Sequence, residues 1–251
     1  LEKILKRQDA IENLLQEPYV LNHLKEHLSS IDDIERLMMK ISTNYASARD
    51  FNALKVSLSS LPAIKAELQA LKSTLHTQLF NGLETLDDLI NLIDQAIVDE
   101  PPLKLGDGNT FKEAFNKELD EYRLINKSSK KWLAQYQSDL RESTQIKTLK
   151  VGYNRVFGYY IEVSKGQAHL MPKTYHRRQT LTNNERFISE ELKEFETKVL
   201  SAEEKISNIE NKLFEELREK LLSYRDPVMK VASILAKLDC IVSLSLLAEK
   251  N

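Results

Sequence analysis

Residues 150–163 read KVGYNRVFGYYIEV, and this stretch decides how the rest of the chain is interpreted. It combines β-branched and aromatic side chains with two glycines. Such residues favour short strands joined by a tight turn, because branched and aromatic side chains pack well on a sheet. Residues 179–181 form a second extended segment of this kind. We therefore expect a small strand-rich insert between residues 147 and 181.

The remaining sequence favours helices. The 251 residues include only 6 Gly and 6 Pro, and 41% are hydrophobic, which is enough for a packed core. The single cysteine, Cys240, excludes an intramolecular disulfide and a cysteine-cluster zinc site, and we expect it to be a small buried hydrophobe. We find no apolar run near the ~18 residues of a membrane span. We expect a cytoplasmic protein with no membrane partner, and a piece of a longer polypeptide because the chain opens without Met.

Apolar periodicity predicts where the helices lie. Over the first hundred residues, apolar side chains recur every three or four positions, which predicts a series of short amphipathic helices. Two capping-box patterns, Thr110–Glu113 and Thr182–Glu185, predict the starts of two much longer helices. These helices are expected to run to about Thr144 and Tyr224.

The predicted fold is mainly α. We expect a helical bundle body and two long antiparallel helices that carry a small mixed α/β tip. The expected segments follow in order: a helical core at 1–110, a first long helix at 111–146, a strand-containing tip at 147–188, a second long helix at 189–225 and a return helix at 226–251.

Charge is distributed unevenly along the chain. Between Lys147 and Arg186, eight basic residues are opposed only by Glu162 and Glu185, so this segment carries +6. The whole chain carries −2, and the remainder therefore carries −8. A localised basic patch is typical of proteins that bind a polyanion. A solvated surface with uneven charge is the alternative.

The insert also contains the residue types that contact DNA phosphates. Arginine, amide and hydroxyl side chains bond phosphate oxygens, and a helix N-terminus binds phosphate through its free amides. The predicted helix start at Thr182 would add such amides. Aromatic residues of the insert could stack on bases, but their alternation favours a miniature core. The candidate DNA-binding residues are Asn154, Arg155, Arg177, Arg178, Thr182 and Asn183.

We find no pattern that supports catalysis. His23–His27 matches H-x-x-E-H, but so short a motif arises easily by chance in a Leu/Lys/Glu-rich helix, and we expect exposed histidines there. No G-x-x-x-x-G-K-[ST] phosphate-binding loop occurs. We therefore expect no catalytic residue, no metal site and no cofactor in this chain, and we expect that it is not an enzyme.

Several segments identify a family by resemblance. Two in the insert closely resemble the clamp of the MutS family of bacterial DNA mismatch-repair ATPases: residues 148–161 and 175–188. Two later segments continue the likeness: residues 191–196 and 213–217. Three upstream segments resemble the lever region of that family: residues 33–36, 96–102 and 116–123. The resemblance covers nearly the whole chain.

The resemblance implies a lever domain plus a clamp that grips duplex DNA through sugar–phosphate contacts. Carried over by position, these contacts fall on Asn154, Arg178, Thr182 and Asn183, where position 182 is often Lys in relatives. It also implies a mismatch-reading domain and a connector before Leu1, and an ATPase after Asn251. For the full-length protein it implies ATP and magnesium, mismatch-containing DNA and a homodimer.

The expected function is therefore non-specific binding of double-stranded DNA by the clamp of a mismatch-repair protein. The resemblance implies that the lever helices couple this clamp to an ATPase outside the chain. The alternative is a helical protein-interaction scaffold whose basic tip binds an acidic partner.

Overall fold

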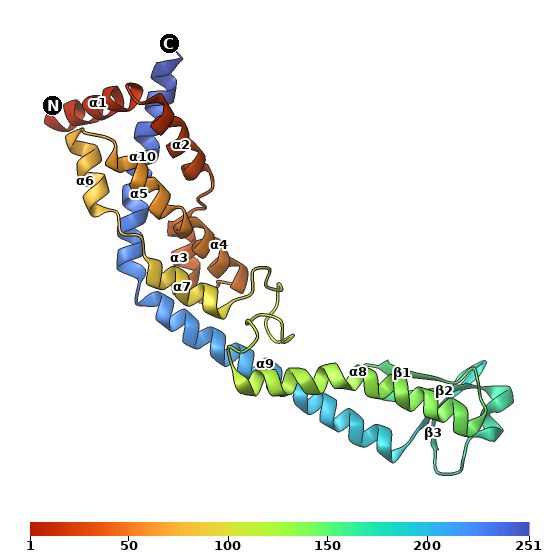
Figure 1. Cartoon of the computed structure of the whole chain (residues 1–251). Helices are drawn as coiled ribbons and strands as arrows, with labels where there is room; N and C mark the ends of the chain where they lie inside the picture. Colours follow the sequence, from red (N-terminus) through yellow and green to blue (C-terminus); the bar gives the residue numbers. More distant parts are fainter. Residues whose placement is uncertain (251) are drawn as a thin grey trace. The chain divides into compact units, whose positions relative to one another are not determined.

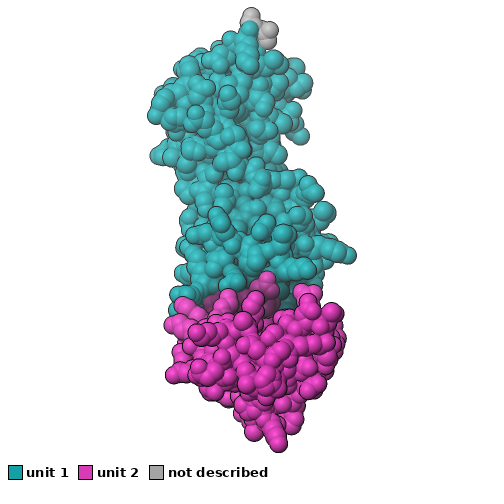
Figure 2. Space-filling view, turned by 90° about the vertical axis from the view of Figure 1, so that its right-hand side faces the viewer, with its two compact units in different colours: residues 1–105, 109–115, 211–251 teal, residues 106–108, 116–210 magenta. Residues whose placement is uncertain are grey.

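The computed structural model describes residues 1–250, and it is mainly helical with one small sheet (Figure 1). This confirms the prediction of a mainly α fold. The chain divides into two compact units (Figure 2). Unit 1 comprises residues 1–105, 109–115 and 211–251, and unit 2 comprises residues 106–108 and 116–210.

Unit 1 is built from short helices that gather along one long helix. The short helices are α1 (Glu2–Leu15), α2 (Pro18–Ser29), α3 (Ile34–Ser42), α4 (Ala48–Ser59), α5 (Leu61–Gln69), α6 (Thr74–Gly82) and α7 (Asp87–Ala96). The long helix, α10 (Arg225–Glu249), packs against α1, α2, α3 and α6. The predicted series of amphipathic helices is confirmed.

Local signals start several of these helices. Ser47 and Asp50 form a reciprocal capping box at α4, and Asp33 accepts a hydrogen bond from the Arg36 amide at the start of α3. Pro18 and Pro62 lie in the first turns of α2 and α5. Proline is well tolerated there because the first amides of a helix have no partner within it.

Helix α10 corrects two expectations. Cys240 is exposed, because at 100° per residue it lies opposite the buried stripe that contains Leu238 and Ile241. Within residues 1–250, α10 is also long and apolar enough to span a membrane, contrary to our expectation for the chain. Core helices of soluble proteins can be equally long and apolar, and one face of α10 is buried in unit 1.

Unit 2 combines two helices with an antiparallel sheet. The helices are α8 (Lys117–Thr144) and the part of α9 (Glu190–Leu222) that ends at Glu210. The strands are β1 (Lys150–Asn154), β2 (Gly158–Ser164), β3 (His176–Thr180) and β4 (Asn184–Ile188), in the order β1-β2-β4-β3. A short 3-10 helix, η1, spans Lys165–Leu170. The strand-rich insert is confirmed.

One face of the sheet packs on the two helices. Ile161, Val163 and Phe187 point into a core that also contains Leu140 and Leu192. At the edge of this core, Trp132 stacks on the rings of Tyr136 and Phe195 with centroid separations of 4.8 and 4.1 Å. The helices therefore hold the sheet through its apolar face, and the opposite face remains available for polar groups.

Both capping-box predictions are wrong. Helix α8 begins at Lys117, capped by Asn116, whereas Thr110 is buried beside the bridge between Ile97 and Phe111. Helix α9 begins at Glu190, where the Ser189 hydroxyl accepts a hydrogen bond from the Leu192 amide at 3.1 Å.

The second error has a tertiary cause. Residues 184–188 pair with β2 on one side and with β3 on the other, and this pairing buries Phe187 and Ile188. Strand pairing therefore satisfies the backbone groups that the predicted helix would have used.

Candidate nucleic-acid interface

The outer face of the sheet is centred on Arg186. Its Nε donates to Glu162 Oε2 at 2.9 Å, and its Nη1 donates to Gln179 Oε1 at 3.1 Å. The guanidinium also lies 4.1 Å from the ring centroid of Tyr160. Glu162 Oε1 accepts a further hydrogen bond from the side-chain NH₂ group of Asn184 at 3.1 Å. This network ties β2, β3 and β4 together, so the charge of Arg186 is neutralised within the sheet.

The aromatic residues of the insert divide between the two faces. Tyr159 packs on the inner core, with its ring edge-on to Phe195 at 5.4 Å. Tyr160 lies on the outer face above Gly152, where an added Cβ would come within 2.9 Å of the tyrosine ring. Tyr153 and Phe157 are 50% and 37% exposed. The expected miniature core therefore includes Tyr159 but not all of the aromatic side chains.

The turn between β1 and β2 places two candidate residues, Asn154 and Arg155. The Asn154 side-chain oxygen accepts hydrogen bonds from the amides of Val156 at 2.8 Å and Phe157 at 3.4 Å. Gly158 closes the turn with a φ of 75°, a conformation that favours glycine. Arg155 is exposed at the tip. Asn154 therefore uses its carbonyl oxygen to shape the turn, and its NH₂ group keeps its capacity to donate.

The turn between β3 and β4 places Thr182 and Asn183. Both are exposed between Leu181 and Asn184, and the Leu181 amide closes the turn by donating to the Asn184 carbonyl at 2.8 Å. The Asn183 carbonyl also accepts from the Lys165 amide at 3.0 Å. The expected helix N-terminus at these residues is wrong. Any phosphate contact here must come from the side chains and from neighbouring Lys165, a residue that we did not predict as a contact.

The two adjacent arginines of β3 differ in environment. Arg177 pairs with Phe187 and Gln179 pairs with Arg186, so Arg178 is the extra residue of a β-bulge. Arg177 Nε lies 3.1 Å from Oε2 of the buried Glu185, so its charge is compensated. Arg178 is exposed, and no acidic group in residues 1–250 pairs with it. The bulge therefore separates a structural arginine from an available one.

The ion pairs account for the net charge of the whole segment. Its two acidic residues, Glu162 and Glu185, each pair with one arginine. The other basic residues are exposed and form no ion pair within the described part of the chain: Lys147, Lys150, Arg155, Lys165, Lys173 and Arg178. The +6 charge inferred from sequence therefore corresponds to six uncompensated side chains.

The strand register divides the candidate residues into two groups. Asn154 pairs with Gly158 at one end of β2, and Asn184 pairs with Ser164 at the other end. Six residue steps of about 3.3 Å separate these ends, a distance of roughly 20 Å. Asn154 and Arg155 therefore lie at one end of the sheet, and Thr182 and Asn183 lie at the other. Arg178 lies on the edge strand at an intermediate level.

The histidines of the H-x-x-E-H pattern belong to unit 1 and have structural partners. His23 Nδ1 lies 2.9 Å from Glu67 Oε1, and its ring contacts Tyr19. His23 and His27 are both partly buried, so our expectation of exposed side chains is wrong. Within residues 1–250, no group of three or more His, Cys, Asp or Glu side chains is arranged to hold a metal ion.

Comparison with known proteins adds family information. Residues 114–205 match the model for MutS family domain IV. The DNA mismatch repair protein MutS of Protochlamydia amoebophila is 48% identical over 250 residues, covering 100% of this chain and 29% of that protein. The proteins of the same name from Halothermothrix orenii and Clostridium botulinum are 44% and 42% identical, over 97% and 99% of this chain and 27% of each relative. The chain thus spans less than a third of these relatives.

Proposed function

Because this chain belongs to the MutS family of DNA mismatch repair proteins, we propose that unit 2 is a clamp that binds double-stranded DNA through its sugar–phosphate backbone. One observation carries the proposal. The only two acidic side chains between Lys147 and Arg186 form ion pairs with arginines of the same segment, and six exposed basic side chains have no acidic partner in the described residues. A polyanion is the partner that such a surface attracts.

The candidate residues make two kinds of contact with DNA, charged and neutral. Arg178 and the exposed lysines supply charge that displaces counterions from phosphate. Asn154, Thr182 and Asn183 supply neutral donors that fix the position of the duplex. Neither kind of contact reads base edges, so the clamp binds duplexes of different sequence with similar affinity. Arg177 contributes less than Arg178, because its guanidinium already pairs with Glu185.

The separation of the two turns supports a two-point grip. A distance of roughly 20 Å corresponds to about six base-pair steps of 3.4 Å along one strand. The turn at Asn154 and the turn at Asn183 would therefore contact phosphates several steps apart. Because residues so far apart share no partners, substitutions at the two turns should have additive effects on binding free energy.

The remaining roles divide between helices of this chain and the full-length protein. We propose that α8 and α9 act as lever helices, since α9 contributes residues to both compact units. ATP hydrolysis with magnesium, mismatch recognition and homodimer formation belong to the full-length protein in this proposal. The chain itself supplies the duplex grip and is not an enzyme.

A salt-dependent titration tests the DNA proposal. Fluorescence anisotropy with a labelled homoduplex and a labelled mismatched duplex should give similar affinities, near Kd values of about 10⁻⁴–10⁻⁶ M at physiological salt. Affinity should fall steeply as salt rises. Asn154→Ala and Asn183→Ala should each weaken binding, and the double variant should show the sum of their free-energy changes.

Arg7→Ala provides the control, because this exposed arginine belongs to unit 1. It should leave DNA binding unchanged. A reproducible ten-fold preference for the mismatch would contradict backbone-only contact. Retention of an acidic protein without any DNA binding would favour the alternative scaffold function.

A further inference from the structure

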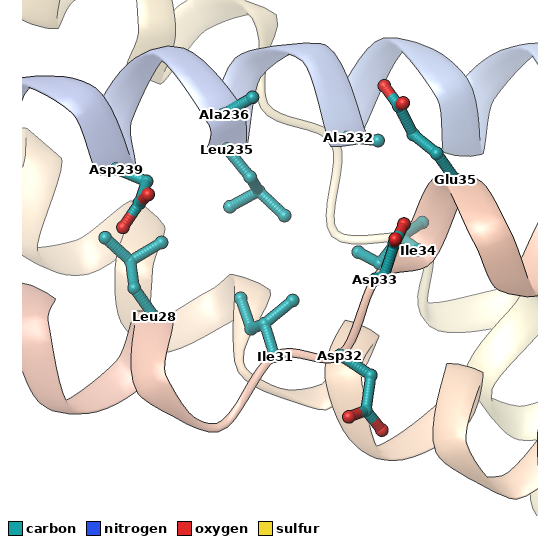
Figure 3. Close-up of a pocket in the computed structure, with 10 residues that line it drawn as sticks. All are labelled: Leu28, Ile31, Asp32, Asp33, Ile34, Glu35, Ala232, Leu235, Ala236 and Asp239. Atoms are coloured by element: carbon teal, nitrogen blue, oxygen red, sulfur yellow. The ribbon is translucent and has the colours of Figure 1, made fainter.

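Unit 1 contains a groove that the DNA proposal does not use. It lies between α10 and the link that joins α2 to α3, and its volume is about 370 Å³ (Figure 3). Its floor is apolar and is formed by side chains from the end of α2, the link and α10: Leu28, Ile31, Ala232, Leu235 and Ala236. The small side chains of Ala232 and Ala236, one helical turn apart, leave this side of α10 open.

The ends of the groove are acidic. Figure 3 shows Asp239 beside Leu28 at one end and Asp33 with Glu35 at the other, with Leu235 and Ile31 between them. Asp32 also lines the groove, and no basic residue does. None of these four carboxylates forms an ion pair with a side chain in residues 1–250. The groove is therefore an apolar strip between two uncompensated negative ends.

Hydrogen bonds hold the link in place. The Asp32 amide donates to the Ser57 hydroxyl at 3.0 Å, and Ser57 is fully buried. The Ile31 amide donates to the Leu28 carbonyl at 3.2 Å, and Asp33 caps α3 through a 2.9 Å bond from the Arg36 amide. Since the link is fixed, the groove is already formed before anything binds, which lowers the entropy cost of association.

The chemistry of the groove selects one class of occupant. A nucleic acid would be repelled by the four carboxylates. A metal ion has no suitable cluster here, because no group of three or more ligating side chains occurs in the described chain. We propose that the groove binds a segment of a partner protein in which aliphatic residues are flanked on both sides by lysine or arginine. The aliphatic side chains cover Leu235 and Ile31, and the basic residues face Asp239 and Glu35.

A peptide titration tests this proposal. The probe is a fluorescein-labelled peptide with adjacent leucines between pairs of lysines, and anisotropy measures its binding to the whole chain. A peptide with serine in place of leucine tests the apolar floor. The double variant Glu35→Lys/Asp239→Lys reverses one charge at each end of the groove and leaves the cap residue Asp33 intact. It should weaken binding of the leucine peptide by about tenfold or more.

A matched control separates a local effect from the change in net charge. Glu12→Lys/Glu249→Lys makes the same charge change at exposed positions of α1 and α10 that do not line the groove. This control should bind the leucine peptide like the parent. Ala236→Trp fills the groove without altering charge and should also weaken binding, with circular dichroism confirming that each variant is folded.

Several outcomes would overturn the proposal. These are absence of binding to the parent, equal binding to the groove variant and its control, or equal binding of the serine peptide. Concentration-dependent self-association of the parent that the groove variant abolishes would assign the groove to a second copy of this chain. Loss of DNA binding by unit 2 would not bear on these results, since the groove residues all lie in unit 1.

Discussion

Acidification should destabilise unit 1 through one buried histidine, His76. The side chain is fully buried on α6, where Nδ1 lies 2.9 Å from the Ser73 hydroxyl. Nε2 has no hydrogen-bond partner in the described chain. Burial lowers the pKa of His76 from its ordinary value of 6.5 to about 4, because the charged imidazolium would lose its hydration.

The sign of the effect follows from proton binding. Between pH 6.5 and about 4, the unfolded chain binds a proton at His76 that the folded chain does not. The free energy of unfolding therefore falls as the pH falls through this range, and no further loss from His76 occurs below it. With 1.36 kcal/mol per pKa unit, the loss between pH 7 and pH 5 is about 2 kcal/mol.

Urea denaturation followed by far-UV circular dichroism at pH 7 and pH 5 measures this loss. His76→Gln removes the titrating group. The difference in free energy of unfolding between pH 7 and pH 5 should therefore be about 2 kcal/mol smaller for this variant than for the parent. Any packing defect of the variant is the same at both pH values and cancels in the comparison. His169→Gln, at an exposed position, should retain the pH dependence of the parent. Parallel pH profiles for the parent and His76→Gln would refute the reasoning, as would an NMR titration that places the His76 pKa near 6.5.

Five further substitutions test unit 2. Arg178→Ala should weaken binding to duplexes of any sequence and flatten the plot of log affinity against log salt concentration by about 0.9 in slope. Arg177→Ala should have a smaller effect, because Arg177 already forms an ion pair with Glu185. Equal effects of the two substitutions in duplex titrations would contradict this. Thr182→Lys should strengthen binding and steepen the slope, and unchanged affinity at low salt would count against a phosphate near that turn. Gly158→Ala should destabilise unit 2 by about 1–3 kcal/mol, because Gly158 has a φ of 75° and the added Cβ would meet Glu196. Gly166→Ala, where nothing lies within 4 Å of the added Cβ, should be close to neutral, and denaturation followed by the fluorescence of the single tryptophan would show whether the two variants differ.

The helix bodies and the strand-rich insert were predictable because both depend on local periodicity. A helix in unit 1 buries one stripe of side chains, and this stripe recurs every three or four residues in the sequence. Helix starts were less predictable. The sequence Thr182–Glu185 matches the capping-box pattern, but in the structure residues 184–188 form a strand with partners on both sides. A local motif contains no information about partners that are distant in the chain.

The candidate site also has features that follow from the sequence and features that depend on the tertiary structure. The sequence by itself determined the excess of positive charge between Lys147 and Arg186, since composition is independent of conformation. Only the tertiary structure decided which charges remain available. Register across the sheet pairs Glu162 with Arg186, and the bulge at Arg178 leaves its neighbour Arg177 beside Glu185. The same register sends Asn154 and Asn183 to opposite ends of the sheet, because pairing between strands, unlike periodicity within one strand, is set by contacts between residues far apart in the chain.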